Sequence, residues 1–250
     1  MCTVIVEVPE KPSDATRLLA VRDEDPARPW DPPGAWWADR PGVIGVRDRR
    51  AGGAWLAAAA SSGSLAVILN RAEDTPSGLP APSNGLLSRG TVVLEEVAGN
   101  SPIDPPGTAN FNLVSAHGSS VTVTSWDGAS LLREPLEPGV HMIAHHGVND
   151  PCSARIETWL PQFRALTGAG DDWSERWVDL LTRTAALPAS DDRAIIRDNR
   201  SHGYPTMSLL ACVAEIRTGD QGRGGRVRLE TAVLREAAVW GEPHFESEII

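Results

Sequence analysis

Several features that would assign a function at once are missing from this chain of 250 residues. It has only three cysteines, an odd number at distant positions, which supply neither a disulfide framework nor the paired knuckles of a zinc site. No glycine-rich phosphate loop of the GxGxxG or GxxxxGKS/T type occurs. The sequence therefore gives no support to nucleotide binding, and we expect no resident cofactor.

Long apolar runs and an excess of positive charge are also missing. No segment approaches the roughly 20 apolar residues of a membrane span, and Glu7 and Glu10 interrupt the N-terminal run before it could form a signal peptide. The 33 acidic and 23 basic residues give a formal net charge of -10, which opposes binding to nucleic-acid phosphates. We expect a cytoplasmic protein without a membrane span or a nucleic-acid partner, and the oligomeric state stays open.

The composition is that of an ordinary globular protein, and its length fits one domain over residues 1–250. The first third consists of short apolar runs separated by proline and glycine, a pattern that predicts strands. These runs are TVIVEV, TRLLAVRDE, PGVIGVRD, AWLAAAA and LAVILN.

The remainder of the chain mixes helical and strand patterns. We predict a helix over LLSRGTVVLEEVAG, a hairpin of FNLVSAH and SVTVTSW, and a closing hairpin of TMSLLACVAEIR and RVRLETAVL, with FESEII as an edge strand. Apolar residues at helical spacing predict two amphipathic helices, over 156–163 and 173–181, with a kink or break at Pro161. Because strands and helices do not alternate regularly, the fold class is α+β with mainly antiparallel sheets.

One segment is predicted to lack regular structure. PARPWDPPGAWWADRPG carries five of the chain's 20 prolines, and proline lacks an N–H donor. It also holds Trp30, Trp36 and Trp37 of the nine tryptophans. These rings would either form the lip of an apolar ligand pocket or anchor the loop to the core.

Cys2 follows the initiator methionine, which is usually removed when the second residue is small. The mature chain would then carry a thiol and an α-amino group on one residue. Since the α-amino group has a reference pKa near 8, it can accept the thiol proton near neutral pH. The alternative is that Cys2 is a small buried residue at the edge of the first strand.

At this point the motifs carry a resemblance. MCTVIVEV, LLAVRDEDPARP, GVIGVRDRRAGGAWLAAAASSGSLAVILNR, SRGTVVLEEV, NFNLVSAH and LEPGVHMIAHH follow in order the pattern of the NRDE family, that of the transport and Golgi organisation protein 2. The family's leading asparagine is Val21 here, whereas Arg22, Asp23 and Glu24 keep the rest.

The resemblance implies an N-terminal nucleophile hydrolase fold: a four-layer αββα sandwich of two antiparallel sheets between helix layers. Cys2 would lie at the end of a central strand. The chain is also similar, more distantly, to the bile-salt and penicillin V acylases, which cleave carbon–nitrogen bonds of linear amides.

By analogy with the acylases, Arg22 and Asp23 would lie beside the Cys2 thiol and amine, and Asn70 would help to form the oxyanion hole. Asp25 is a rival carboxylate, because the acylases space their arginine and aspartate as R-x-x-D. The alternatives are a charged strand end that makes weak surface ion pairs, and an asparagine that bonds its own turn.

Two positions depart from the related pattern. His145, next to His146, stands where an asparagine is expected, and Pro205 stands where the family has an arginine. His145 can still donate to an oxyanion, but a proline cannot replace a charge. The histidines at 141, 145 and 146 also suggest a metal site, although hydrogen-bonded histidines near a pocket are more common. Cys152 and Cys212 are interpreted as core or surface thiols.

The leading hypothesis is a cysteine hydrolase that acts on a linear amide, with Cys2, Arg22, Asp23, Asn70 and His145 in its site and a small-molecule ligand that has an apolar portion. The second is a non-catalytic carrier of haem or another apolar ligand, with Cys2 or His145 as an axial ligand. The third is an interaction protein that has lost catalysis.

Overall fold

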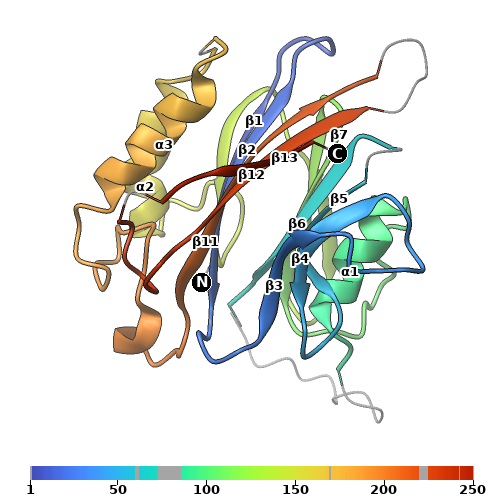
Figure 1. Ribbon diagram of the computed structural model, residues 1–250, viewed down its shortest axis with the longest axis horizontal. Coiled ribbons are helices and arrows are strands. Elements are labelled where there is room, and N and C mark those ends of the chain that lie inside the picture. The colour runs from blue at the N-terminus through green and yellow to red at the C-terminus, as the bar shows by residue number, and fades with distance from the viewer. Residues whose placement is uncertain are drawn as a thin grey trace.

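Two antiparallel sheets stack face to face in the computed structural model, which describes residues 2–59, 62–72, 86–168, 170–219, 225–241 and 243–249 (Figure 1). The first sheet has six strands in the order β10-β1-β2-β11-β12-β13. Its strands are β1 (Thr3–Val8), β2 (Thr16–Glu24), β10 (Gly139–Ile143), β11 (Met207–Arg217), β12 (Arg226–Val233) and β13 (Glu246–Ile249).

The second sheet has seven strands in sequential order, from β3 to β9. Each strand pairs antiparallel with its neighbour in the chain. The strands are β3 (Trp30–Gly34), β4 (Val43–Asp48), β5 (Ala54–Ala59), β6 (Ser64–Asn70), β7 (Phe111–His117), β8 (Ser120–Trp126) and β9 (Leu131–Pro135).

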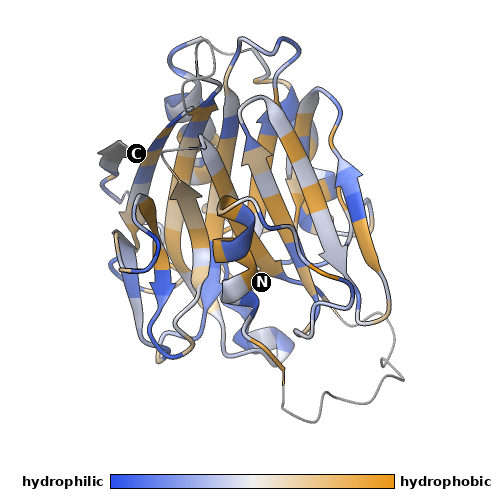
Figure 2. Cartoon of the chain, turned by 90° about the vertical axis from the view of Figure 1, so that its right-hand side faces the viewer, coloured by the Kyte–Doolittle hydropathy of each residue, from blue (hydrophilic) through white to orange (hydrophobic). Residues whose placement is uncertain are grey.

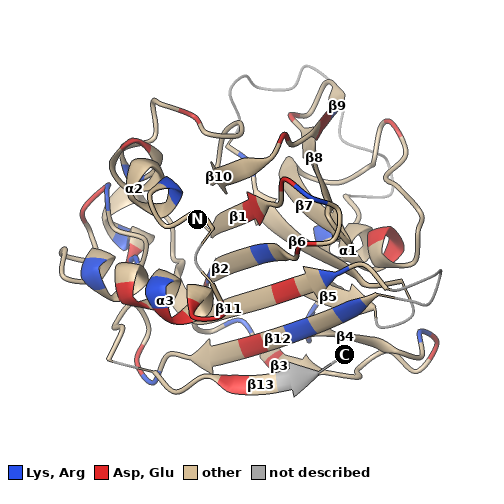
Figure 3. Cartoon of the chain, turned by 90° about the horizontal axis from the view of Figure 1, so that it is seen from above, with Lys and Arg blue, Asp and Glu red and all other residues tan. Residues whose placement is uncertain are grey.

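The helices lie on the outer faces of the two sheets. α2 (Ala154–Arg164) and α3 (Trp173–Thr184) lie beside the first sheet, and α1 (Arg89–Val97) lies beside the second, as Figures 1 and 3 show from two directions. A short 3₁₀ helix, η1 (Asn199–His202), precedes β11. The expected α+β class with antiparallel sheets is confirmed. None of the described helices has the length and apolar character needed to cross a membrane.

β1 is buried on both faces, which explains its unbroken apolar run. Val4 and Val6 belong to the core between the sheets, whereas Ile5 belongs to the core that α2 and α3 cover. Successive side chains of a strand point to opposite faces, so a strand that is covered on both faces is apolar at nearly every position. Figure 2 shows the same apolar character across the strands behind α1.

Most of the predicted elements are confirmed. β2 covers TRLLAVRDE, β7 and β8 form the predicted hairpin, and β11 pairs with β12, to which β13 adds as an edge strand. Of the glycine-rich turn between β11 and β12, residues 220–224 lie outside the described part of the chain.

Of the kink or break predicted at Pro161, the break is wrong, because α2 continues to Arg164 with Pro161 inside it. The missing N–H leaves the carbonyl of Glu157 without its helical partner. Glu157 is exposed, so that carbonyl lies on the solvent side of the helix. The buried face is thus undisturbed by the proline.

The prediction that the proline-rich segment lacks regular structure is also wrong in part. Residues Trp30–Gly34 form β3, which pairs only with β4 and is therefore an edge strand. The pairing is irregular between Asp31 and Gly34, and the two prolines, Pro32 and Pro33, lie within that irregularity. Proline is tolerated there because an edge strand needs donors on one side only.

The three tryptophans of this segment anchor it to the rest of the protein. The Trp37 Nε1 group donates to the carbonyl of Gly52 at 2.8 Å. Trp36 lies under the Arg47 guanidinium, whose carbon is 4.9 Å from the ring centre, and Trp30 lies in the same way under Arg22 at 5.2 Å.

Gly53 of the GGAWL motif and Gly90 of α1 allow α1 to approach β5 closely. A Cβ atom on Gly53 would lie 2.5 Å from the carbonyl carbon of Gly90 and 2.6 Å from its Cα. A Cβ atom on Gly90 would in turn meet the backbone of residues 53 and 54 at 2.9 Å. The first turn of α1 is therefore in direct backbone contact with the start of β5.

We predict that Gly53→Ala destabilises the fold by roughly 1–3 kcal/mol, because the added methyl group meets backbone that no side-chain rotation can move. Urea unfolding followed by circular dichroism measures this loss. Gly147→Ala is the matched control, since a Cβ atom there meets nothing within 4 Å and the residue lacks a positive φ. Equal stabilities of the two variants would contradict the prediction.

Candidate functional site

Cys2 lies at the end of a central strand of the first sheet, directly before β1. β1 pairs antiparallel with β2 so that Thr3 faces Val21, and this register brings Cys2 beside the next residues of β2. The backbone N–H of Asp23 donates to the Cys2 Sγ at 3.3 Å, and the thiol donates to the Asp23 carbonyl at 3.5 Å. The Cys2 side chain is only 7% exposed.

Cys2 forms part of the wall of a cavity of about 450 Å³. The wall is built from the end of β2, the starts of β5 and α1, and the end of β6. Four of the five predicted site residues lie in this wall: Cys2, Arg22, Asp23 and Asn70.

Arg22 and Asp23 occupy opposite faces of β2. Leu18 and Ala20 belong to the core between the sheets, and Arg22 continues that face. The Arg22 side chain is 2% exposed, and its Nη2 group donates to Glu24 Oε2 at 3.4 Å.

Asp23 is the carboxylate beside the thiol, and Asp25 is not. The Asp23 carboxylate accepts from Ser208 Oγ at 2.6 Å and from Asn199 Nδ2 at 3.2 Å. Asp25 instead accepts the backbone N–H of Ala27 in the turn after β2 and lies outside the cavity wall. Ser208 and Asn199 were missed by sequence reasoning, because both are distant from Asp23 in the sequence: the pairing of β11 with β2 brings Ser208 to Asp23, and Asn199 lies in η1, which precedes β11.

Asn70 and His145 are placed differently. Asn70 ends β6 with an exposed side chain at the cavity. His145 follows β10 and does not line this cavity. Its Nδ1 atom is buried and has no hydrogen-bond partner among the described residues, and its ring centre lies 4.3 Å from that of His146.

A buried arginine lies near Cys2, although the position of the family's arginine is Pro205, which is exposed. Arg155 of α2 donates to the Oγ1 of Thr3, the residue next to Cys2. Its burial and the nearby Arg197 lower the pKa of Arg155 to about 10. The sequence feature that could have identified Arg155 as buried is its spacing, because it lies four residues before Trp159 on the apolar face of the helix.

The surroundings of Cys2 favour the thiol over the thiolate. Burial, followed by the negative charge of Asp23, raises the pKa of the Cys2 thiol above its ordinary value, while Arg22 acts in the opposite direction. The other thiols fit their interpretation as core and surface residues: Cys212 is buried, and Cys152 is exposed. A thiol in this state needs a proton acceptor before it can act as a nucleophile.

His141 of β10 makes hydrogen bonds to its neighbours. The Nε2 atom of His141 lies 2.8 Å from the carbonyl oxygen of Glu137, and its Nδ1 atom lies 3.0 Å from Asn149 Nδ2. Within the described ranges, no group of three His, Cys, Asp or Glu side chains could hold a metal ion.

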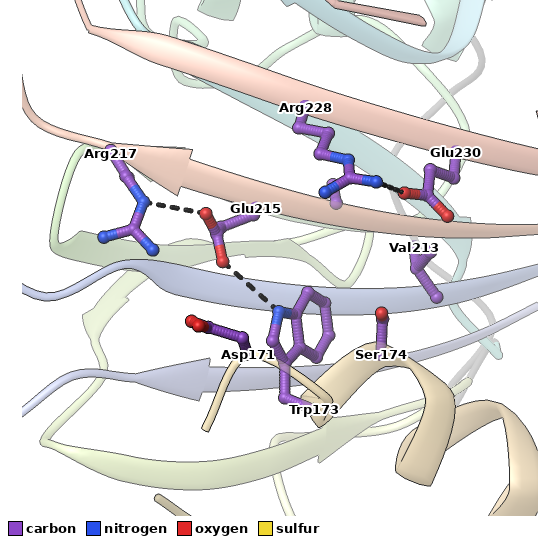
Figure 4. Close-up of a pocket in the computed structure, with 9 residues that line it drawn as sticks. Asp171, Trp173, Ser174, Val213, Glu215, Arg217, Arg228 and Glu230 are labelled. Carbon is purple, nitrogen blue, oxygen red and sulfur yellow. Dashed lines mark hydrogen bonds and ion pairs between the residues drawn. The ribbon is translucent and has the colours of Figure 1, made fainter. Parts of the chain in front are cut away.

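A second cavity, of about 170 Å³, lies between α3 and the outer ends of β11 and β12 (Figure 4). Its two arginines are each paired with a glutamate: Arg217 with Glu215 at 2.7 Å and Arg228 with Glu230 at 2.6 Å. The described residues of its wall include no cysteine or histidine. The cavity at Cys2 is therefore the stronger candidate for a functional site.

Comparison with known families identifies the family of the chain. The model of the family described as Transport and Golgi organisation 2 matches residues 1–207. The chain belongs to this family. The match includes Cys2, Arg22, Asp23, Asn70 and Arg155, so the whole wall around the thiol lies in the part that the family shares. No curated protein matches the sequence.

We predict an acid-dependent loss of stability that originates at His145. Its burial, together with the charges of His146 and Arg155, lowers the pKa of His145 to about 4, from an ordinary value of 6.5. Between these values the unfolded chain binds a proton that the folded chain does not, so stability falls as the pH drops through this window.

Because the His145 ring is partly exposed, we expect its titration to lower the free energy of unfolding by roughly 1–2 kcal/mol, which is less than the shift in pKa alone would give. His145→Gln should lose less stability than the parent chain between pH 6.5 and pH 4, measured by urea unfolding. His244→Gln, at an exposed position, is the control. Parallel stability curves for the parent chain and His145→Gln would disprove the assignment.

Proposed function

We propose that the protein is a cysteine N-terminal nucleophile hydrolase that cleaves the carbon–nitrogen bond of a linear amide. The observation that carries this proposal is the position of the Cys2 thiol in the wall of a 450 Å³ cavity that it shares with Arg22 and Asn70. The volume is that of a small-molecule site. The two stacked sheets with helices outside them are compatible with the αββα layers of such hydrolases.

The base in this proposal is the α-amino group of Cys2, exposed by removal of Met1. The raised pKa of the buried thiol means that the thiolate must be generated during the reaction. None of the described residues that line the cavity is a histidine, whereas an α-amine with a reference pKa near 8 lies on the same residue as the sulfur.

The reaction then follows in two steps. The Cys2 thiol gives its proton to the α-amine while Sγ attacks the amide carbonyl, and the resulting tetrahedral oxyanion collapses to a thioester. The C–N bond breaks as the ammonium returns the proton to the leaving nitrogen. Water next attacks the thioester with the amine as base, the C–S bond breaks, and the carboxylic acid leaves as the thiol recovers its proton.

The neighbouring side chains have separate roles in this scheme. The Asn70 amide donates to the oxyanion. The positive charge of Arg22 favours the thiolate. Asp23, whose carboxylate is fixed by Ser208 and Asn199, orients the α-amine.

We predict that the purified protein begins at Cys2 and forms a single acyl adduct on that residue when it is incubated with an aliphatic β-lactone. Intact mass spectrometry followed by peptide mapping measures both properties. Cys2→Ala should form no adduct, whereas Cys152→Ser, which removes the exposed thiol, should react like the parent chain.

Retention of Met1, or equal labelling of the parent chain and Cys2→Ala, would refute the hydrolase. A Soret shift on addition of haem that disappears in Cys2→Ala would then favour the carrier hypothesis.

We predict that Asn70→Ala lowers kcat for an acyl p-nitroanilide by roughly 10²–10³, the usual cost of a lost oxyanion donor, with little change in KM. The matched control is Asn100→Ala, since Asn100 hydrogen-bonds to Glu95 on the surface and is not part of the cavity. An unchanged kcat would remove Asn70 from the mechanism.

A further inference from the structure

The cavity at Cys2 contains hydrogen-bond donors that no described residue uses. Arg22 is 2% exposed, yet its Nε and Nη1 groups lack a partner within the described part of the chain. The indole N–H of Trp55, in the same wall and 7% exposed, also lacks one. Buried donors without acceptors are costly, which indicates that an acceptor occupies this space in the working protein.

Arg89 adds a partly buried positive charge to the same wall. It is the first residue of α1 and donates to the carbonyl of Asn110 at 3.0 Å. None of the described ion pairs includes Arg89. Burial lowers the pKa of the Arg89 guanidinium, while the negative charge of Glu24 acts in the opposite direction.

The carboxylates of the cavity are already engaged. Asp48 accepts from the Arg28 Nε group at 3.0 Å and from the backbone N–H of Arg50 at 2.9 Å. Glu24 binds Arg22 and the backbone N–H of Asp25. Among the described residues of the wall, these two carboxylates are therefore already hydrogen-bonded, whereas Arg22 and Trp55 have unused donors, although the formal charges of the wall balance.

The N-terminus of α1 faces the same space. Ser88, Arg89 and Gly90 line the cavity, and Ser88 caps the helix through the backbone N–H of Gly90 at 3.2 Å. The partial positive charge at a helix N-terminus favours an anion. The close contact between Gly53 and Gly90 fixes this end of the helix against β5.

We propose that this wall is an anion subsite, formed by Arg22, Arg89, Trp55 and the start of α1, which binds a carboxylate or phosphate group of the substrate. The inference deepens the proposed function, on which it rests, by naming the substrate class: a linear amide that carries an anionic group. The exposed side chains of Leu86 and Leu87 line the same cavity and provide an apolar surface for an aliphatic portion.

Binding of three probes with one alkyl chain tests the subsite: octanoate, octyl phosphate and the neutral octanamide. Calorimetric titration of the full chain should show binding of at least one anion about tenfold tighter than binding of octanamide. The tighter of the two anions identifies the group that the site prefers. Arg89→Gln should remove the preference, and Arg89→Lys should retain part of it.

Arg176→Gln is the matched control, because Arg176 lies on α3 and pairs with Asp172 outside the cavity. Equal binding of octanamide and both anions, or the same preference in Arg89→Gln as in Arg176→Gln, would overturn the subsite. Thermal unfolding of each variant excludes a folding defect as the cause.

The titrations are repeated with Cys2→Ala, which cannot form a thioester. Anion preference in Cys2→Ala without lactone acylation of the parent chain would keep the subsite and reject the hydrolase. Acylation of Cys2 without anion preference would keep the hydrolase and reject the subsite.

Discussion

The pairing of β1 with β2 inside a sheet covered on both faces is the constraint on which the site depends. The register places Cys2 against Asp23, and the pleat directs consecutive side chains of β2 to opposite faces of the sheet. Arg22 faces the space between the sheets, while the Asp23 carboxylate faces the elements that carry Asn199 and Ser208. A shift of this pairing by one residue would exchange the two charges.

The charges around the thiol are held by contacts from distant parts of the chain. The Asp23 carboxylate accepts a hydrogen bond from Ser208, and Thr3 accepts one from Arg155 of α2. The Arg22 guanidinium lies over the ring of Trp30, which belongs to an edge strand of the other sheet. Removing one partner of such a pair leaves the other polar group buried without a hydrogen-bond or charge partner, which is destabilising. The site is therefore stabilised by the first sheet with its helices and, through Trp30, by the second sheet.

Much of the fold could be predicted from the sequence because local patterns determined it. β2 and the β7–β8 hairpin follow from β-branched runs and turn residues, and α3 follows from its spacing of tryptophan and leucine. Pro161 and the prolines of β3 were misread, because proline is disfavoured only where its missing donor is needed, and that depends on the surrounding structure.

The site could be predicted in part. The resemblance identified Cys2, Arg22, Asp23 and Asn70, and all four lie in one cavity wall. The choice between Asp23 and Asp25 required the register of the sheet, and Arg155 required the packing of α2. His145 lies outside the cavity wall, because the chain leaves β10 before it reaches that residue.

β3 also has a consequence for assembly. An edge strand normally offers a row of free N–H and C=O groups to any passing strand, which invites aggregation. Pro32 and Pro33 have no N–H group to offer, and Asp31 carries a charge that is bound to Arg47. The β3 edge of the seven-stranded sheet is thus a poor template for strand addition. The prolines that make its pairing with β4 irregular also protect the protein against association through that edge.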